Sequence, residues 1–227
     1  VESGRTPLIV QIGTFALSSD DKFTDTDLWN RVLTLLPDEV RNASRMVFVE
    51  PNGLVFPELR KNIQSLGLDP SKSQVVNAMI TDVCESEHIP MYHFSAQAEL
   101  DFGVPHYIYY AWFSTRPDYP TVAVRGFSKH SALDMVGKEK WLAFAAAQNL
   151  SAYIQQLLVP CMSPSALMAA AGATVADMVM LVIDAEEADV KIVNRFLDIA
   201  GFAPAYLQYE CTVWNLTSYL DLLPRER

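Results

Sequence analysis

The sequence predicts an α/β fold, in which a mostly parallel, Rossmann-like sheet carries helices on both of its faces. Short apolar runs with strand character alternate along the chain with segments whose apolar residues recur at helical spacing. The run MVMLVI, residues 178–183, is continuously apolar, which is typical of a strand buried on both faces of a parallel sheet. We expect one domain over residues 1–227, with residues 96–159 as an insertion or substrate-side segment.

Strands and helices are predicted to alternate in the first half of the chain. The run LIVQI, residues 8–12, is a short buried strand that Gly13 ends, and residues 27–36 have helical spacing. A second helix over residues 54–66 is expected to stop at Gly67. The other apolar runs of this half are predicted strands at 46–50 and 73–80, and residues 89–95 are expected to form a further strand or an extended piece.

The second half of the chain begins less regularly. Residues 101–126 are rich in aromatic residues and prolines without a clean period, so loop and short strand are expected there. Apolar spacing predicts one helix over residues 138–158. The segment SPSALMAAAG has helix signals at both ends, with Ser163 as N-cap, Pro164 in the first turn and Gly172 after the last. The remaining predictions are a strand at 178–183, a helix at 187–199 and a strand at 204–210.

Composition excludes some classes of partner. The formal net charge is −10, whereas a protein that binds duplex nucleic acid needs a basic stripe, so no nucleic-acid partner is expected. No window of about 18 residues is apolar and free of charge, so no membrane span is expected. The aromatic-rich stretch within residues 101–159 could form a surface for a protein partner or for a second copy of the chain.

Sequence signals for the compartment point in two directions. The three cysteines, Cys84, Cys161 and Cys211, are odd in number and have no metal-ligand spacing, so free thiols and no metal site are expected. The opening VESGRTPLIV lacks the basic and apolar regions of a signal peptide, so either there is none or it has been removed. We expect the cytoplasm or an organelle. Three acceptor patterns for N-glycosylation, at Asn42, Asn149 and Asn215, keep the secretory lumen as an alternative.

Acidic residues follow most of the predicted parallel strands. Glu50 ends the second strand, while Asp184 and Glu186 follow the run MVMLVI. In an open α/β sheet, ligands bind outside the carboxyl ends of the strands, where these acids would converge. Glu50 could accept hydrogen bonds from both hydroxyls of a ribose, or it could cap its own loop. Asp184 and Glu186 could act as metal ligands, as a general base, or as charges at a helix N-terminus.

A family resemblance joins these segments. The strings LIVQIG, MVFVEPNGLVFPELRKNIQ, QVVNAMITD, SPSALMAAAG and DMVMLVIDAEEADVKIVNRFL occur in the order of the motifs of one enzyme family. They resemble the FkbM-type branch of the class I S-adenosylmethionine-dependent methyltransferases, whose motifs include a strand ending in QIGANDG, a strand ending in EPNP and the block DLLKIDVEGAE. The agreement covers residues 8–95 and 160–211, and residues 96–159 match poorly.

The resemblance implies that the protein binds S-adenosylmethionine and methylates a hydroxyl of a carbohydrate or small metabolite. It implies that Glu50 binds the ribose, that Asp184 and Glu186 face the methyl group and the substrate, and that His130, in GFSKHSAL, lies on the substrate side as a base or substrate contact. The other implied cofactor contacts are Gln11, Gly13 and Thr14 at the methionine part, Pro51 and Asn52 at the adenosine, and Ala78 and Met79 at the adenine.

The chain also departs from the family pattern, which leaves a second hypothesis open. The glycine-rich loop becomes GTFALSSDD with one glycine, and the glycine after the acid of DVEG is replaced by Glu187. Two edge strands usually follow the fifth strand in this family, and either this chain lacks them or the sequence covers only part of the protein. The alternative to an active methyltransferase is therefore a degenerate methyltransferase-like domain that serves as a structural or interaction subunit.

Overall fold

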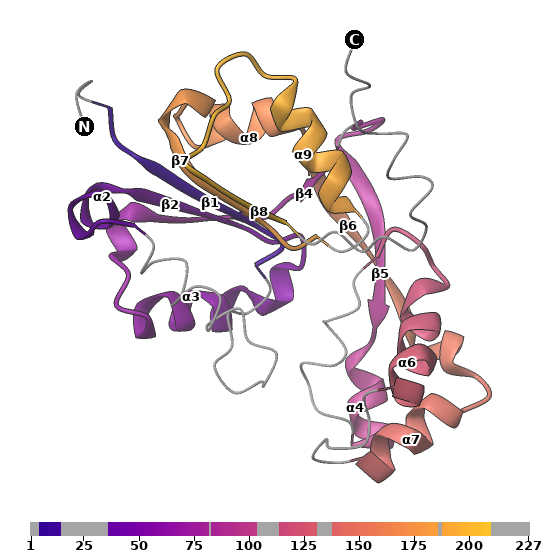
Figure 1. The fold of residues 1–227 in the computed structure, drawn as a ribbon. Coiled ribbons are helices and arrows are strands. Elements are labelled where there is room, and N and C mark those ends of the chain that lie inside the picture. Colours follow the sequence, from indigo (N-terminus) through magenta and orange to yellow (C-terminus); the bar gives the residue numbers. More distant parts are fainter. Residues whose placement is uncertain are drawn as a thin grey trace.

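A computed structural model describes residues 5–14, 36–81, 83–103, 114–130, 138–185 and 188–209 of the chain (Figure 1). The predicted helix at 27–36 lies almost wholly outside these residues, and Glu186, Cys211 and Asn215 also lie outside them. No helix in the described ranges has the length and apolar character that crossing a bilayer requires.

The main sheet has five parallel strands, as the sequence predicts. They are β1 (Leu8–Ile12), β2 (Arg45–Val49), β3 (Ser73–Val76), β7 (Met178–Ile183) and β8 (Tyr206–Tyr209). Their order in the sheet is β3-β2-β1-β7-β8, and every neighbouring pair is parallel. All five residues of the central strand β1 are buried. The fold is therefore α/β and compatible with a Rossmann-like architecture.

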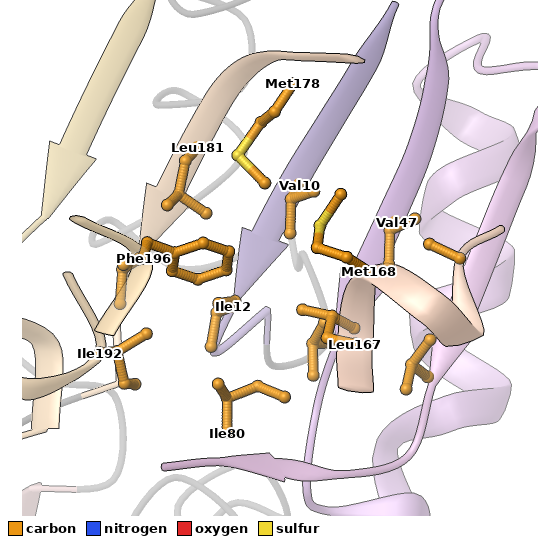
Figure 2. Packing of buried hydrophobic residues seen from close by; sticks show 14 of the residues in the cluster. Val10, Ile12, Val47, Ile80, Leu167, Met168, Met178, Leu181, Ile192 and Phe196 are labelled. Atoms are coloured by element: carbon orange, nitrogen blue, oxygen red, sulfur yellow. The ribbon is translucent and has the colours of Figure 1, made fainter. Parts of the chain in front are cut away.

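Helices cover both faces of this sheet (Figure 1). One face packs against α8 (Pro164–Ala170) and α9 (Asp189–Leu197), where Val10, Ile12 and Leu181 meet Leu167 and Phe196 (Figure 2). The other face carries Ile9 and Phe48 against Leu59 and Ile63 of α3 (Phe56–Ser65). Because successive side chains of a strand point to opposite faces, β1 supplies both cores. The short α2 (Asp38–Ala43) precedes β2 along the chain.

Helix α8 confirms its predicted capping signals. The Ser163 hydroxyl oxygen accepts a hydrogen bond from the Ala166 backbone N–H at 3.2 Å, and Pro164 is the first helical residue. Gly172 follows the helix with a φ of 58°, a conformation that glycine adopts at little cost. Single turns of 3₁₀ helix also occur in the described ranges, at η1 (Gly53–Val55), η2 (Pro70–Lys72), η4 (Leu150–Tyr153) and η5 (Val175–Asp177).

The predicted strand at 73–80 is divided between two sheets. β3 ends at Val76, and the next two residues with strand pairing, β4 (Met79–Ile80), run parallel to β6 (Ile154–Met162). β6 also pairs antiparallel with β5 (His88–Phe94), in register from His88 opposite Pro160 to Phe94 opposite Ile154. The second sheet therefore has the order β4-β6-β5.

Two sequence predictions in the middle of the chain are wrong. Residues 138–158 are not one helix, because α7 (Lys138–Ala146) ends early and residues from Ile154 onward form β6. The apolar spacing there also fits a half-buried strand, and pairing with β5 decides between the two. Residues 101–126 are not all loop and strand, because α4 (Ala96–Phe102) extends into them and α6 (Tyr119–His130) begins there. Pro120 is tolerated because it lies in the first turn of α6.

We call residues 88–162 the hairpin unit, since β5 and β6 form its stem and α4, α6 and α7 gather at the far end from the main sheet (Figure 1). Phe94, Phe144 and Leu150 are buried in its separate core. The rings of Phe94 and Phe144 lie edge to face with centroids 4.9 Å apart, a favourable geometry for an aromatic pair.

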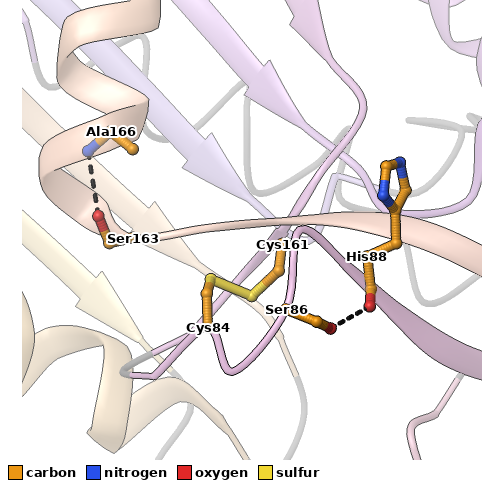
Figure 3. Close-up of a disulfide and its surroundings, with 6 residues drawn as sticks. All are labelled: Cys84, Ser86, His88, Cys161, Ser163 and Ala166. Carbon is orange, nitrogen blue, oxygen red and sulfur yellow. Dashed lines mark hydrogen bonds between the residues drawn. A yellow bond between two sulfur atoms is a disulfide. The ribbon is translucent and has the colours of Figure 1, made fainter.

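A disulfide joins the base of the hairpin unit to the preceding loop, so the expectation of free thiols is wrong for Cys84 and Cys161 (Figure 3). Their Cα atoms are 5.7 Å apart although 77 positions separate them in the sequence. The loop returns beside β6 because the Cys161 N–H donates to the Glu87 carbonyl at 2.9 Å. The spacing of the cysteines in the sequence could not predict that Cys84 and Cys161 lie close together, because their proximity depends on the pairing of β4 and β5 with β6.

Candidate functional site

The carboxyl ends of β2, β1 and β7 meet at one edge of the main sheet, and two of the predicted acids follow these strands. Glu50 comes directly after β2 and Asp184 directly after β7, on the two strands that flank β1. Neighbouring strands are about 4.8 Å apart, so the backbones of these two residues are separated by roughly 10 Å. In a Rossmann-like sheet, this edge is where ligands bind.

Gly13 connects the three strand ends. Its N–H donates to the Val49 carbonyl at 2.9 Å, and the Asp184 N–H donates to the Ile12 carbonyl at 2.9 Å. With a φ of 76°, Gly13 turns so sharply that a Cβ atom on it would lie 1.7 Å from the Asp184 carbonyl oxygen. The space left by the missing side chain accommodates the backbone that leaves β7, and only glycine fits there.

Glu50 is held by its own loop. Only 5% of the residue is exposed, and its Oε1 accepts a hydrogen bond from the Asn52 N–H at 2.8 Å. Its own N–H donates to the Val76 carbonyl at 3.0 Å. A buried carboxylate needs such partners, because burying an unpaired charge costs several kcal/mol. One oxygen of the carboxylate therefore caps the loop, which is one of the two roles that the sequence left open, and the ribose-binding role stays a prediction.

Two buried amides at this edge have unused hydrogen-bonding atoms. Gln11 is fully buried in β1, and neither its Nε2 nor its Oε1 has a partner within the described residues. It pairs in register with Phe48 and Val182, which places it on the sheet face that packs against α3. Asn52 is also fully buried, and its Nδ2 lacks an acceptor in the same part of the chain. An unsatisfied buried polar group costs about 1–3 kcal/mol, so both amides suit a polar ligand.

The loop after β7 is fixed by a carboxylate that sequence reasoning did not select. Asp189 is 3% exposed in the first turn of α9, and its Oδ2 accepts a hydrogen bond from the Ala185 N–H at 3.1 Å. This contact holds Asp184 and Ala185 at the strand end, while the neighbouring Glu186 lies outside the described residues. An acid at the first turn of a helix is a recognisable signal in the sequence.

Asn77 is a second structural residue of the site that the sequence reasoning missed. Its Nδ2 donates to the Pro51 carbonyl at 2.8 Å and to the Glu50 carbonyl at 3.1 Å. The side chain thus bridges the end of β3 to the loop after β2. The available signal was an asparagine, a residue that is depleted in strands, inside the predicted strand at 73–80.

The remaining predicted site residues are placed as follows. Thr14 is fully buried, and its hydroxyl donates to the Val49 carbonyl at 3.1 Å, while Pro51 lies in the loop after β2. Ala78 is buried in the core next to α8 and α9, and Met79 pairs with Cys161 in the second sheet. His130 is the last residue of α6 in the hairpin unit, and its side chain lies outside the described part. The predicted cofactor roles of these residues stay predictions.

A cavity of about 580 Å³ lies elsewhere, lined by Arg41, Met46, Leu68 and Ser73 among others. Met46 and Ser73 stand near the amino ends of β2 and β3, so this cavity opens at the edge of the sheet opposite Glu50. It is therefore distinct from the candidate site. Within the described ranges, no group of three or more histidine, cysteine or acidic side chains could hold a metal ion.

Neither a scan against models of protein families nor a search of curated protein sequences found a match to this chain.

Proposed function

We propose that this chain binds S-adenosylmethionine at the carboxyl edge of the main sheet and transfers its methyl group to a hydroxyl of a carbohydrate or small metabolite. The observation that carries the proposal is a pair of fully buried amides beside the acid Glu50. Within the described residues, Nε2 and Oε1 of Gln11 and Nδ2 of Asn52 have no hydrogen-bond partner. A ligand with amino-acid and ribose hydroxyl groups would satisfy such atoms.

In this proposal, each residue has a simple task. Glu50, Gln11 and Asn52 would hold the cofactor, which when bound supplies an electrophilic methyl group on a sulfonium. Asp184 would accept the proton that the acceptor hydroxyl loses as its oxygen forms the new bond to carbon. The protein otherwise contributes alignment of the two reactants and exclusion of water.

The alternative is a methyltransferase-like domain that acts as a structural or interaction subunit without catalysis. This alternative is favoured because two polar side chains of the site already form hydrogen bonds with the protein's own backbone. Glu50 Oε1 accepts from the Asn52 N–H, and the Thr14 hydroxyl donates to the Val49 carbonyl. In this reading, both side chains are retained because they hold the strand ends together.

Calorimetric titration with S-adenosylhomocysteine tests the proposal. Glu50→Gln keeps an oxygen that can accept the Asn52 N–H but removes the charge, so it should preserve the fold and weaken binding at least tenfold. Glu58→Ala removes an exposed carboxylate from the first turn of α3 and should bind as the parent does. Asp184→Asn should reduce turnover, measured as S-adenosylhomocysteine release over a panel of sugars and hydroxylated metabolites, more than it reduces binding.

A negative result is equally informative. A ligand at 100 times its dissociation constant stabilises the native state by about 2.7 kcal/mol. If millimolar S-adenosylhomocysteine leaves the melting temperature of the parent protein unchanged, the non-catalytic subunit becomes the better hypothesis.

A further inference from the structure

We propose that Asn149 is an N-glycosylation site and that the chain matures in a compartment that both oxidises thiols and glycosylates proteins, as the secretory lumen does. Two independent features support this inference, namely the Cys84–Cys161 disulfide and the geometry of the segment Asn149-Leu150-Ser151. Neither feature belongs to the candidate site at the main sheet.

The disulfide indicates an oxidising environment. Cytosolic thiols are kept reduced by glutathione and thioredoxin, whereas lumenal and extracellular proteins retain their disulfides. When this bond forms, the two cysteine thiols lose two electrons and two protons to the disulfide of an oxidised thiol–disulfide oxidoreductase, which becomes a dithiol. The bond joins the loop before β5 to β6, so it fixes the base of the whole hairpin unit (Figure 3).

The acceptor segment lies on an exposed turn between α7 and β6. Asn149 precedes the single turn η4, and both Asn149 and Ser151 are exposed, while Leu150 between them is 1% exposed and anchors the turn in the core of the hairpin unit. The Ser151 hydroxyl donates to Asn149 Oδ1 at 3.3 Å. This contact uses the amide oxygen and leaves Nδ2, the atom that forms the glycosidic bond, available.

The other described acceptor pattern has a different geometry, which is why we select Asn149. Asn42 lies within α2, and Ser44, the hydroxyl residue of its pattern, is 1% exposed. The Ser44 hydroxyl donates to the Val40 carbonyl at 2.7 Å and so faces its own helix instead of Asn42. The Asn42 carbonyl also accepts a hydrogen bond from Lys72 Nζ at 2.7 Å.

The modification itself is a group transfer from a lipid-linked oligosaccharide diphosphate. The Asn149 Nδ2 forms a bond to the anomeric carbon of the first sugar, the bond from that carbon to the phosphate oxygen breaks, and the lipid diphosphate leaves. Nδ2 loses one proton in the same exchange. The resulting glycan would cover the exposed turn before β6, on the hairpin unit and away from the edge of the main sheet that carries Glu50 (Figure 1).

Secretion from cultured eukaryotic cells tests the glycan. The peptide that contains Asn149 should carry one, which mass spectrometry detects as conversion to aspartate by peptide N-glycosidase in ¹⁸O-labelled water. Asn149→Gln and Ser151→Ala should each remove the mass of one glycan. Ser151→Thr keeps the acceptor pattern and should retain that mass. The matched control, Asn194→Gln, changes an exposed asparagine without an acceptor pattern and should leave the mass of the glycan unchanged. An unmodified Asn149 in the secreted parent protein overturns the glycan assignment.

Alkylation of the endogenous protein tests the compartment. In the cells that make it, Cys84 and Cys161 should resist alkylation until a reductant is added. Rapid alkylation of both cysteines without reductant overturns the proposed compartment, whatever the secreted chain carries.

Discussion

The main sheet and the hairpin unit are stabilised in different ways. In the main sheet, both faces are covered, β1 is buried throughout, and backbone hydrogen bonds connect the ends of three strands at Gly13. In the hairpin unit, β6 is largely half-exposed or exposed, and Leu158 is 60% exposed. Among its described residues, the stabilising features are a small aromatic core and the disulfide at its base.

This difference predicts two levels of local stability. A region with many buried apolar contacts opens only with the whole domain, whereas a region with few of them can open separately. We therefore expect the main sheet to behave as one cooperative unit. The hairpin unit should open at lower free energy once its covalent link is broken.

The largest effect is expected at the main sheet, for Gly13→Ala. The new Cβ would overlap the Asp184 carbonyl oxygen, and a positive φ disfavours any residue with a Cβ, so the loss should exceed about 4 kcal/mol. Urea denaturation measures it. Gly67→Ala is the matched control, because Gly67 has a φ of 72° but no atom within 4 Å of the added Cβ, and it should cost only about 1 kcal/mol. Equal losses for the two variants would mean that the strand ends are not packed as described.

A smaller effect, confined to the hairpin unit, is expected when the disulfide is removed. In the entropic model, a disulfide that closes a loop of this length stabilises the protein by about 4.5 kcal/mol, and disulfides often contribute less than this model gives. In a Cys84→Ser/Cys161→Ser variant, hydrogen exchange should quicken in β5 and β6 and change little in β1 and β7. Reductant should reproduce this pattern in the parent protein and have no effect on the variant. Equal acceleration in both regions would argue against separate opening.

The smallest effect concerns pH and His93, which is 5% exposed in β5. Burial lowers the pKa of His93, although its Nδ1–H donates to the Phe94 carbonyl at 2.7 Å, which opposes the shift. On acidification, the unfolded state therefore takes up the proton first. The contribution of neutral His93 to the free energy of unfolding is complete above about pH 6.5 and is lost as the pH falls toward the native pKa. The slope cannot exceed about 1.4 kcal/mol per pH unit for one proton.

Unfolding free energies at pH 8.0 and 5.5 test this pH dependence. In His93→Asn, the free energy of unfolding should fall less between pH 8.0 and 5.5 than in the parent protein. In His88→Asn, which changes an exposed histidine of the same strand, it should fall as much as in the parent. If the parent protein and His93→Asn lose equal stability on acidification, another group is responsible.

Much of the fold was predictable because its signals are local. A continuously apolar run such as MVMLVI has to be buried on both sides, and Ser163, Pro164 and Gly172 define a helix by their own backbone preferences. The position of Glu50 after β2 followed from the same reasoning, since a parallel sheet brings the carboxyl ends of its strands to one edge.

The sequence by itself determined the alternation of elements and the edge at which the acids Glu50 and Asp184 gather, because apolar periodicity and capping act over a few residues. Only the tertiary structure decided that residues 154–162 are a strand and that Cys84 meets Cys161. It also decided that the bare Cα of Gly13 accommodates the Asp184 carbonyl. These three outcomes depend on segments far apart in the chain, whose approach is set by strand pairing and packing and leaves no local trace in composition or spacing.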